Sequence, residues 1–192
     1  MHRRYLYFIV LFLIPPIAGS AELSEQILTP TSLGSIKLGM HLQQMSNVNG
    51  GRKFAEISGK IARSYCYRMF SAEAGPDDMT NIQFVGLRTP VVERIDIEAV
   101  HPPDGETPPD PRYIANRVRT RERVAIGDPV ARVLQVYRED KRYRLIRTSE
   151  RYVIVALKGK QRVGYAFVSD GKVVASVRAG RLAALEHQES CE

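Results

Sequence analysis

The chain has 192 residues and carries 28 Lys and Arg against 21 Asp and Glu, a formal net charge of +7. Its four histidines are scattered, and neither of its two cysteines has a metal-binding residue nearby, which argues against a structural zinc site. The positive charge is uneven. Residues 112–162 carry 15 basic and five acidic side chains, whereas residues 22–111 carry eight and twelve.

The N-terminus, residues 1–21, is typical of a secretory signal peptide. Two arginines precede the unbroken apolar run of residues 5–14, two prolines end it, and small residues at 18–21 suit signal peptidase. The run is shorter than the ~20 apolar residues that a membrane-spanning helix needs, although an uncleaved anchor is the alternative. We therefore expect a periplasmic or secreted protein whose mature form has no transmembrane helix.

Residues 31–100 are predicted to form a first module. Leu42, Met45 and Val48 lie on one face of a short helix, and a second helical segment is expected within residues 52–61. Three strands should follow, over residues 64–70, 81–87 and 91–97.

A proline-rich linker is expected at residues 101–112, which contain five prolines. Proline lacks an amide donor and fixes φ, so this stretch cannot continue a helix or a central strand. We therefore place the boundary between two modules here.

Residues 113–180 are predicted to form a second, basic module, followed by a tail at residues 181–192. Apolar side chains recur with the period of an amphipathic helix at Val130, Val133, Leu134 and Tyr137. Asp128 is expected to cap this helix, with Pro129 in its first turn. Three strands should follow, over residues 151–157, 162–168 and 173–177.

The two modules share a short pattern, which indicates an internal repeat. Ile36-Lys37-Leu38-Gly39 is echoed by Val124-Ala125-Ile126-Gly127, and the apolar strand that begins at Val91 corresponds to the one at Val173. Each copy places an apolar helix face before an antiparallel meander. The predicted fold class is therefore α+β, with two tandem two-layer modules, each of short helices packed on a small antiparallel sheet.

The cysteines, Cys66 and Cys191, permit a disulfide in an oxidising compartment. A bond closing so long a loop would stabilise the protein by ~4 kcal/mol in the chain-entropy model. The alternative is a buried thiol at Cys66 and a loose terminal thiol at Cys191.

The step Leu38-Gly39-Met40 before a helical turn, followed by a small sheet, resembles two bacterial envelope families. They are the tandem β-lactamase-inhibitor-protein-like domain and the BamE-type (SmpA/OmlA) lipoprotein domain. The resemblance implies helices laid on a small antiparallel sheet and a protein that binds other proteins without catalysis. This chain departs from the pattern at His41, where the families have a hydroxyl residue, and it lacks the lipid-anchor cysteine.

The basic segment is the candidate binding site. Four arginines alternate between residues 117 and 123, so an extended strand would place them on one face. Further basic residues follow the helix, among tyrosines that add contact area, and arginine binds carboxylates and phosphates bidentately. The predicted site comprises Arg117, Arg119, Arg121, Arg123, Arg138, Lys141, Arg142 and Arg144. The alternative is a solvated basic surface without a partner.

No catalytic pattern is found, such as a nucleophile elbow or a phosphate-binding glycine loop, so we expect neither enzyme activity nor a cofactor or metal. We expect an exported binding protein that docks an envelope protein, an anionic envelope polymer or an anionic lipid, and not nucleic acid. The alternative function is inhibition of a secreted or periplasmic enzyme, such as a β-lactamase or a cell-wall hydrolase. A cell-wall-acting enzyme is a third hypothesis.

Overall fold

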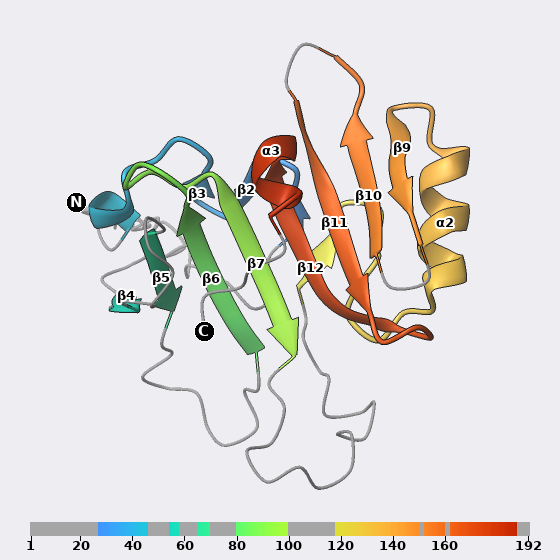
Figure 1. Ribbon diagram of the computed structural model, residues 1–192, viewed down its shortest axis with the longest axis horizontal. Helices are drawn as coiled ribbons and strands as arrows, with labels where there is room; N and C mark the ends of the chain where they lie inside the picture. The colour runs from blue at the N-terminus through green and yellow to red at the C-terminus, as the bar shows by residue number, and fades with distance from the viewer. Residues whose placement is uncertain are drawn as a thin grey trace, which may run out of the picture.

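The central element of the fold is one antiparallel sheet of eight strands, in the order β4-β5-β6-β7-β12-β11-β10-β9 (Figure 1). The structure is a computed structural model that describes residues 27–45, 54–57, 65–69, 80–99, 118–149, 152–159 and 162–187. The eight strands are β4 (Phe54–Ile57), β5 (Tyr65–Met69), β6 (Thr80–Gly86), β7 (Arg94–Ala99), β9 (Tyr143–Thr148), β10 (Tyr152–Leu157), β11 (Val163–Ser169) and β12 (Val174–Arg181).

The two halves of the chain share this sheet. Strands β4 to β7 come from the first half and β9 to β12 from the second, and the halves join where β7 pairs with β12. The prediction of an α+β fold with two small sheets is therefore wrong, because the described residues form mostly strands. The last strand of each half would otherwise expose an unpaired edge, and pairing the two edges satisfies the backbone groups of both.

A second layer covers one face of the large sheet. It consists of helix α2 (Val130–Glu139) and of a small sheet in the order β3-β2-β1-β8. The small strands are β1 (Ile27–Thr29), β2 (Ser32–Leu33), β3 (Ile36–Lys37) and β8 (Arg119–Thr120). One apolar cluster between the layers includes Leu28, Ile95 and Val153, so residues of both halves bury a common core.

Helices contribute less than the sequence predicts. Helix α2 is confirmed, with Val133 and Tyr137 buried, but Asp128 does not cap it: its Oδ2 accepts from the backbone N–H of Ala125 at 2.9 Å. In the first half, Leu42–Gln44 form a 3₁₀ turn and Met45 is helical, and the rest of the expected helix lies outside the described residues. The segment expected to be helical at residues 52–61 contains strand β4. No helix in the described parts of the chain is long and apolar enough to cross a membrane.

Gly39 and Gly127, which correspond in the repeated sequence pattern, have similar backbone conformations and similar hydrogen bonds. Gly39 has a φ of 82° and its N–H donates to the carbonyl oxygen of Val92 at 2.8 Å. Gly127 has a φ of 85° and its N–H donates to the carbonyl oxygen of Val174, also at 2.8 Å. In each half, the glycine before a helical turn is thus bonded to a residue at, or two residues before, the start of that half's last strand.

Replacement of Gly127 by alanine should lower the free energy of unfolding by about 1–2 kcal/mol, because an L-residue at positive φ is strained. The space around this position is open, so backbone strain and not a clash is the cause. Urea unfolding followed by circular dichroism measures the effect. Gly127→Asn should cost less than Gly127→Ala, since asparagine tolerates this conformation. Equal losses for the two variants would contradict this explanation.

The opposite face of the large sheet buries an ionic network. Arg94 on β7 is 1% exposed and binds Asp96, which is fully buried, through Nε to Oδ1 and Nη2 to Oδ2, each at 2.8 Å. Arg178 on β12 lies directly opposite Asp96 in the sheet register, with 3.9 Å between Nε and the carboxylate. A charged pair at this depth requires full pairing, because an unpaired buried charge is costly.

This network holds helix α3 (Leu182–Leu185), which was expected to belong to a tail, against the sheet. Arg94 Nη1 donates to the carbonyl oxygens of Ala184 at 3.0 Å and His187 at 2.9 Å. The hydroxyl of Tyr152 donates to the carbonyl oxygen of Leu185. The carbonyl groups left unpaired at the end of this helix are therefore satisfied by side chains of the sheet.

Candidate functional site

The alternating arginines of the second half do not lie on one extended strand. Strand β8 ends at Thr120, residues 121 and 122 form a turn, and Arg123 has a φ of 64°. Exposure nevertheless alternates: Arg119, Arg121 and Arg123 are exposed, whereas Thr120 is buried and the Glu122 side chain is 4% exposed. We call the three exposed arginines the basic ridge. Arg117 lies outside the described residues.

The basic ridge runs beside helix α2. Arg132 on α2 donates from Nη2 to the carbonyl oxygen of Arg123 at 3.3 Å, and this contact fixes the turn against the helix. In the part of the chain that the structure describes, none of the three ridge arginines forms an ion pair. Their charges therefore face solvent without compensation.

Glu122, the acidic residue within this segment, is turned inward. Its carboxylate accepts from the hydroxyl of Tyr143 at 2.9 Å, from the hydroxyl of Tyr137 at 3.2 Å, and from Arg142 Nη2 at 3.1 Å. Burial raises the pKa of both tyrosines above its ordinary value, and the negative charge of Glu122 adds to the shift, so both remain donors. Within the described residues, Glu122 therefore forms its ion pair with Arg142 and none with the arginines of the basic ridge.

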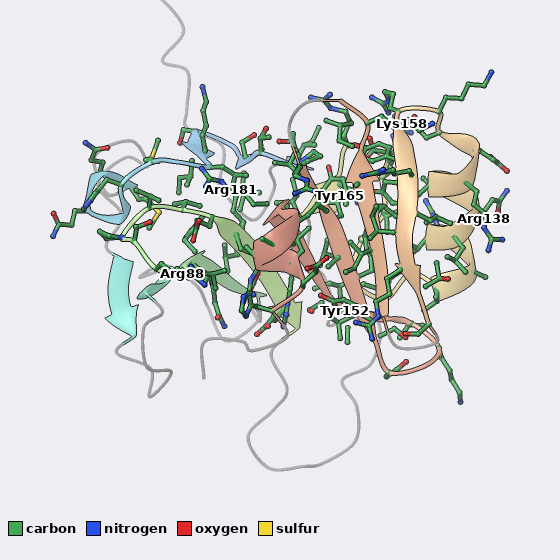
Figure 2. The ribbon with its side chains drawn as sticks, turned by 45° about the horizontal axis from the view of Figure 1, so that its top comes forward. Arg88, Arg138, Tyr152, Lys158, Tyr165 and Arg181 are labelled. Carbon is green, nitrogen blue, oxygen red and sulfur yellow. The ribbon has the colours of Figure 1, made fainter. Side chains whose placement is uncertain are left out.

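The remaining basic residues of the predicted site are separated from one another. Arg142 is 2.6 Å from Asp140 and 3.1 Å from Glu122, so its charge is offset, and its hydrogen bond lowers the pKa of Asp140. Arg138 is six residues after Arg132, which places the two about 120° apart around the helix. Figure 2 shows Arg138 on the outer side of α2. Lys141 is exposed in the turn that follows.

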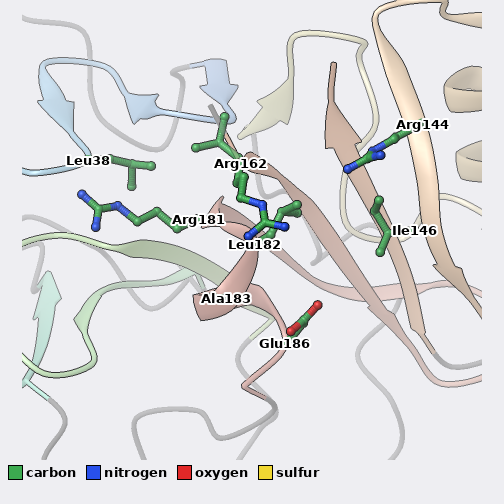
Figure 3. Close-up of a pocket in the computed structure, with 9 residues that line it drawn as sticks. Leu38, Arg144, Ile146, Arg162, Arg181, Leu182, Ala183 and Glu186 are labelled. Carbon is green, nitrogen blue, oxygen red and sulfur yellow. The ribbon is translucent and has the colours of Figure 1, made fainter. Parts of the chain in front are cut away.

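Arg144 lies on the face of the sheet away from α2. Its neighbours on β9, Tyr143 and Leu145, pack into the core, so the alternation of the strand directs Arg144 to the other side. It lines a pocket of about 700 Å³ (Figure 3), which the sequence did not predict and which also reaches Leu38 beside β3. Arg162 and Arg181 line it too, and only the strand pairing brings these three arginines together.

The side chain of Cys66 and the whole of Cys191 lie outside the described residues, so the disulfide stays a prediction. Across the described ranges, no group of three or more His, Cys, Asp or Glu side chains could hold a metal ion.

Comparisons with known proteins do not assign the chain to a family. No family model and no curated protein matches it. Among solved structures, it is similar to the crystal structure of the uncharacterized protein YfeY from Escherichia coli, at 11% sequence identity. The match covers 81% of this chain and 99% of that chain, with a TM-score of 0.46. A likeness at this level carries no functional information.

Proposed function

We propose that this is an exported, non-catalytic binding protein that docks an anionic partner in the cell envelope through its basic second half. The partner is an acidic protein face or an anionic envelope polymer or lipid. The contact surface is the basic ridge together with the neighbouring exposed side of helix α2.

The observation that carries the proposal is the burial of the Glu122 carboxylate. A carboxylate among four arginines would ordinarily offset their charge, but here the Glu122 side chain is 4% exposed and is bound by Arg142 and two tyrosines. The arginines on either side of it, Arg121 and Arg123, remain exposed. The local fold therefore concentrates positive charge at the surface, which favours association with an anionic partner.

Charge reversal of the basic ridge should weaken capture of the partner by at least about 100-fold. Each basic residue near an anionic surface contributes about 1 kcal/mol, and the variant Arg119→Glu/Arg121→Glu/Arg123→Glu replaces three attractions by repulsions. The measurement uses the immobilised chain without residues 1–21, and the analytes are detergent-solubilised envelope extract, purified lipopolysaccharide and anionic lipid vesicles.

A matched control carries the same charge change elsewhere. Arg88, Lys158 and Lys172 are exposed, and the variant with glutamate at all three should retain most of the binding. Equal losses for the two variants would show that only net charge matters, and unchanged binding by the ridge variant would refute the proposal. Binding of lipid or polymer that disappears at high salt identifies an electrostatic contact. One protein that stays bound at high salt but is lost with the ridge variant identifies a shaped protein interface.

A further inference from the structure

We propose that the pocket between β9 and α3 binds a single-chain anionic amphiphile, with a carboxylate or phosphate head and a short hydrocarbon tail. This site is separate from the basic ridge, and it does not depend on the function proposed above. Its volume of about 700 Å³ falls within the range of small-molecule pockets, about 300–1,000 Å³.

Three arginines give the pocket its positive charge. Arg144 comes from β9, Arg162 directly precedes β11, and Arg181 ends β12. Arg144 and Arg162 form no ion pair in the described part of the chain, whereas Arg181 has Glu93 at 3.5 Å. One acidic residue, Glu186, also lines the pocket. Guanidinium groups bind carboxylate and phosphate with two parallel hydrogen bonds, so an excess of arginine selects an anionic head.

The remaining lining is apolar, which an inorganic anion alone would not require. It consists of Leu38, Ile146, Val163, Leu182 and Ala183. Ile146 is 41% exposed and is one of two large hydrophobic residues exposed within the described ranges. An exposed isoleucine beside three arginines is suited to a ligand that has both an apolar tail and a charged head. Figure 3 shows Ile146 and Arg144 on one side of the pocket and the residues of α3 on the other.

The row of the sheet that begins at Arg144 continues with small residues, two of which directly follow or precede the lining residues Val163 and Arg181. Arg144 pairs with Ala156, Ala156 with Gly164, and Gly164 with Gly180, so the row across the sheet has almost no side-chain bulk. A Cβ atom added at Gly164 would lie 1.9 Å from the carbonyl oxygen of Val155, so this strand position excludes any larger residue. The opposite wall, helix α3, is anchored by Arg94 and therefore keeps its distance from β9.

Isothermal titration calorimetry with decanoate, decyl phosphate, decanol and inorganic phosphate tests the proposal, each ligand below its micelle concentration. We expect decanoate or decyl phosphate to bind at least tenfold more tightly than either decanol or inorganic phosphate. The preferred head, carboxylate or phosphate, is read from the first two. Arg144→Ser and Arg162→Ser should each weaken binding of the preferred ligand at least tenfold, since a hydrogen bond to a charged group is lost.

Two further variants complete the test. Ala183→Trp fills the pocket without changing its charge, and it should abolish binding of the tailed ligands. Arg88→Ser removes an exposed arginine of the first half, labelled in Figure 2, and should leave binding unchanged. The proposal is overturned if no ligand binds, if inorganic phosphate binds as tightly as the amphiphiles, or if Arg144→Ser behaves like Arg88→Ser. Arg144 and Arg162 are exposed, so their variants should fold normally, which circular dichroism checks.

Discussion

Replacing Arg94 with methionine is expected to lower the free energy of unfolding by about 3–5 kcal/mol, as for other buried ion pairs that lose one partner. Asp96 is fully buried and would lose its bidentate partner, and the carbonyl oxygens of Ala184 and His187 would lose their donor. Helix α3 should loosen at the same time. Urea unfolding gives the stability, and amide hydrogen exchange within residues 182–187 reports the state of α3.

Two controls separate the lost ion pair from a general effect of removing arginine. Arg132→Met breaks an exposed pair with Asp128, 3.6 Å apart, and should change stability by less than about 1 kcal/mol. The double variant Arg94→Met/Asp96→Leu removes both buried charges and should be more stable than Arg94→Met alone. If Arg94→Met costs no more than Arg132→Met, the network does not stabilise the fold in the way described.

Truncation of Tyr137 to alanine should cost about 3–5 kcal/mol, similar to other large aromatic deletions in cores. Tyr137 is 1% exposed, and its ring lies 5.0 Å from that of Tyr143, 5.8 Å from that of Tyr165 and 5.3 Å from that of Phe167. Val133 and Tyr137 are the two buried residues of α2, so the helix would lose its largest buried side chain. Thermal and urea unfolding followed by circular dichroism measure the loss.

Tyr137→Phe isolates the hydroxyl from the ring. The phenylalanine ring keeps the aromatic contacts, and Glu122 keeps the hydroxyl of Tyr143 and the guanidinium of Arg142 as donors. The expected cost is therefore about 1 kcal/mol, the contribution of one hydrogen bond. A loss in Tyr137→Phe as large as in Tyr137→Ala would mean that hydrogen bonding to Glu122, and not ring packing, holds α2 in place.

Local pattern was sufficient to predict several strands and the long helix. Strands β10, β11 and β12 and helix α2 begin within one residue of the positions expected from alternation and periodicity. Strand β9 was missed, because Arg144 and Arg147 give it the composition of a solvated segment while only Tyr143 and Leu145 face the core. The pairing of β7 with β12 was also missed, since contacts between strands about 80 residues apart leave no local signal.

In the candidate sites, too, local features could be predicted from the sequence, and features that depend on strand pairing could not. Exposure of Arg119, Arg121 and Arg123 follows from the alternation of residue types, although the backbone there turns and is not extended. The arginine-lined pocket joins Arg144, Arg162 and Arg181, which are spread over 37 residues and meet only because β9, β11 and β12 belong to one sheet. In the sequence, Arg94 and Asp96 resemble exposed charges on a strand surface, and the contact of Arg94 with α3 has no local signal.

The junction of the two halves has an approximate twofold axis. Val173 follows Val91 by 82 residues in the repeated pattern, and Arg178 follows Asp96 by the same interval, so the axis passes between Asp96 and Arg178. A residue on this axis would therefore face the same residue if two copies of one half paired through this edge. Two β7 edges would oppose aspartate to aspartate, and two β12 edges would oppose arginine to arginine, whereas β7 against β12 opposes unlike charges. Charge at one pair of positions thus disfavours self-association of either half and favours the closed, intramolecular pairing.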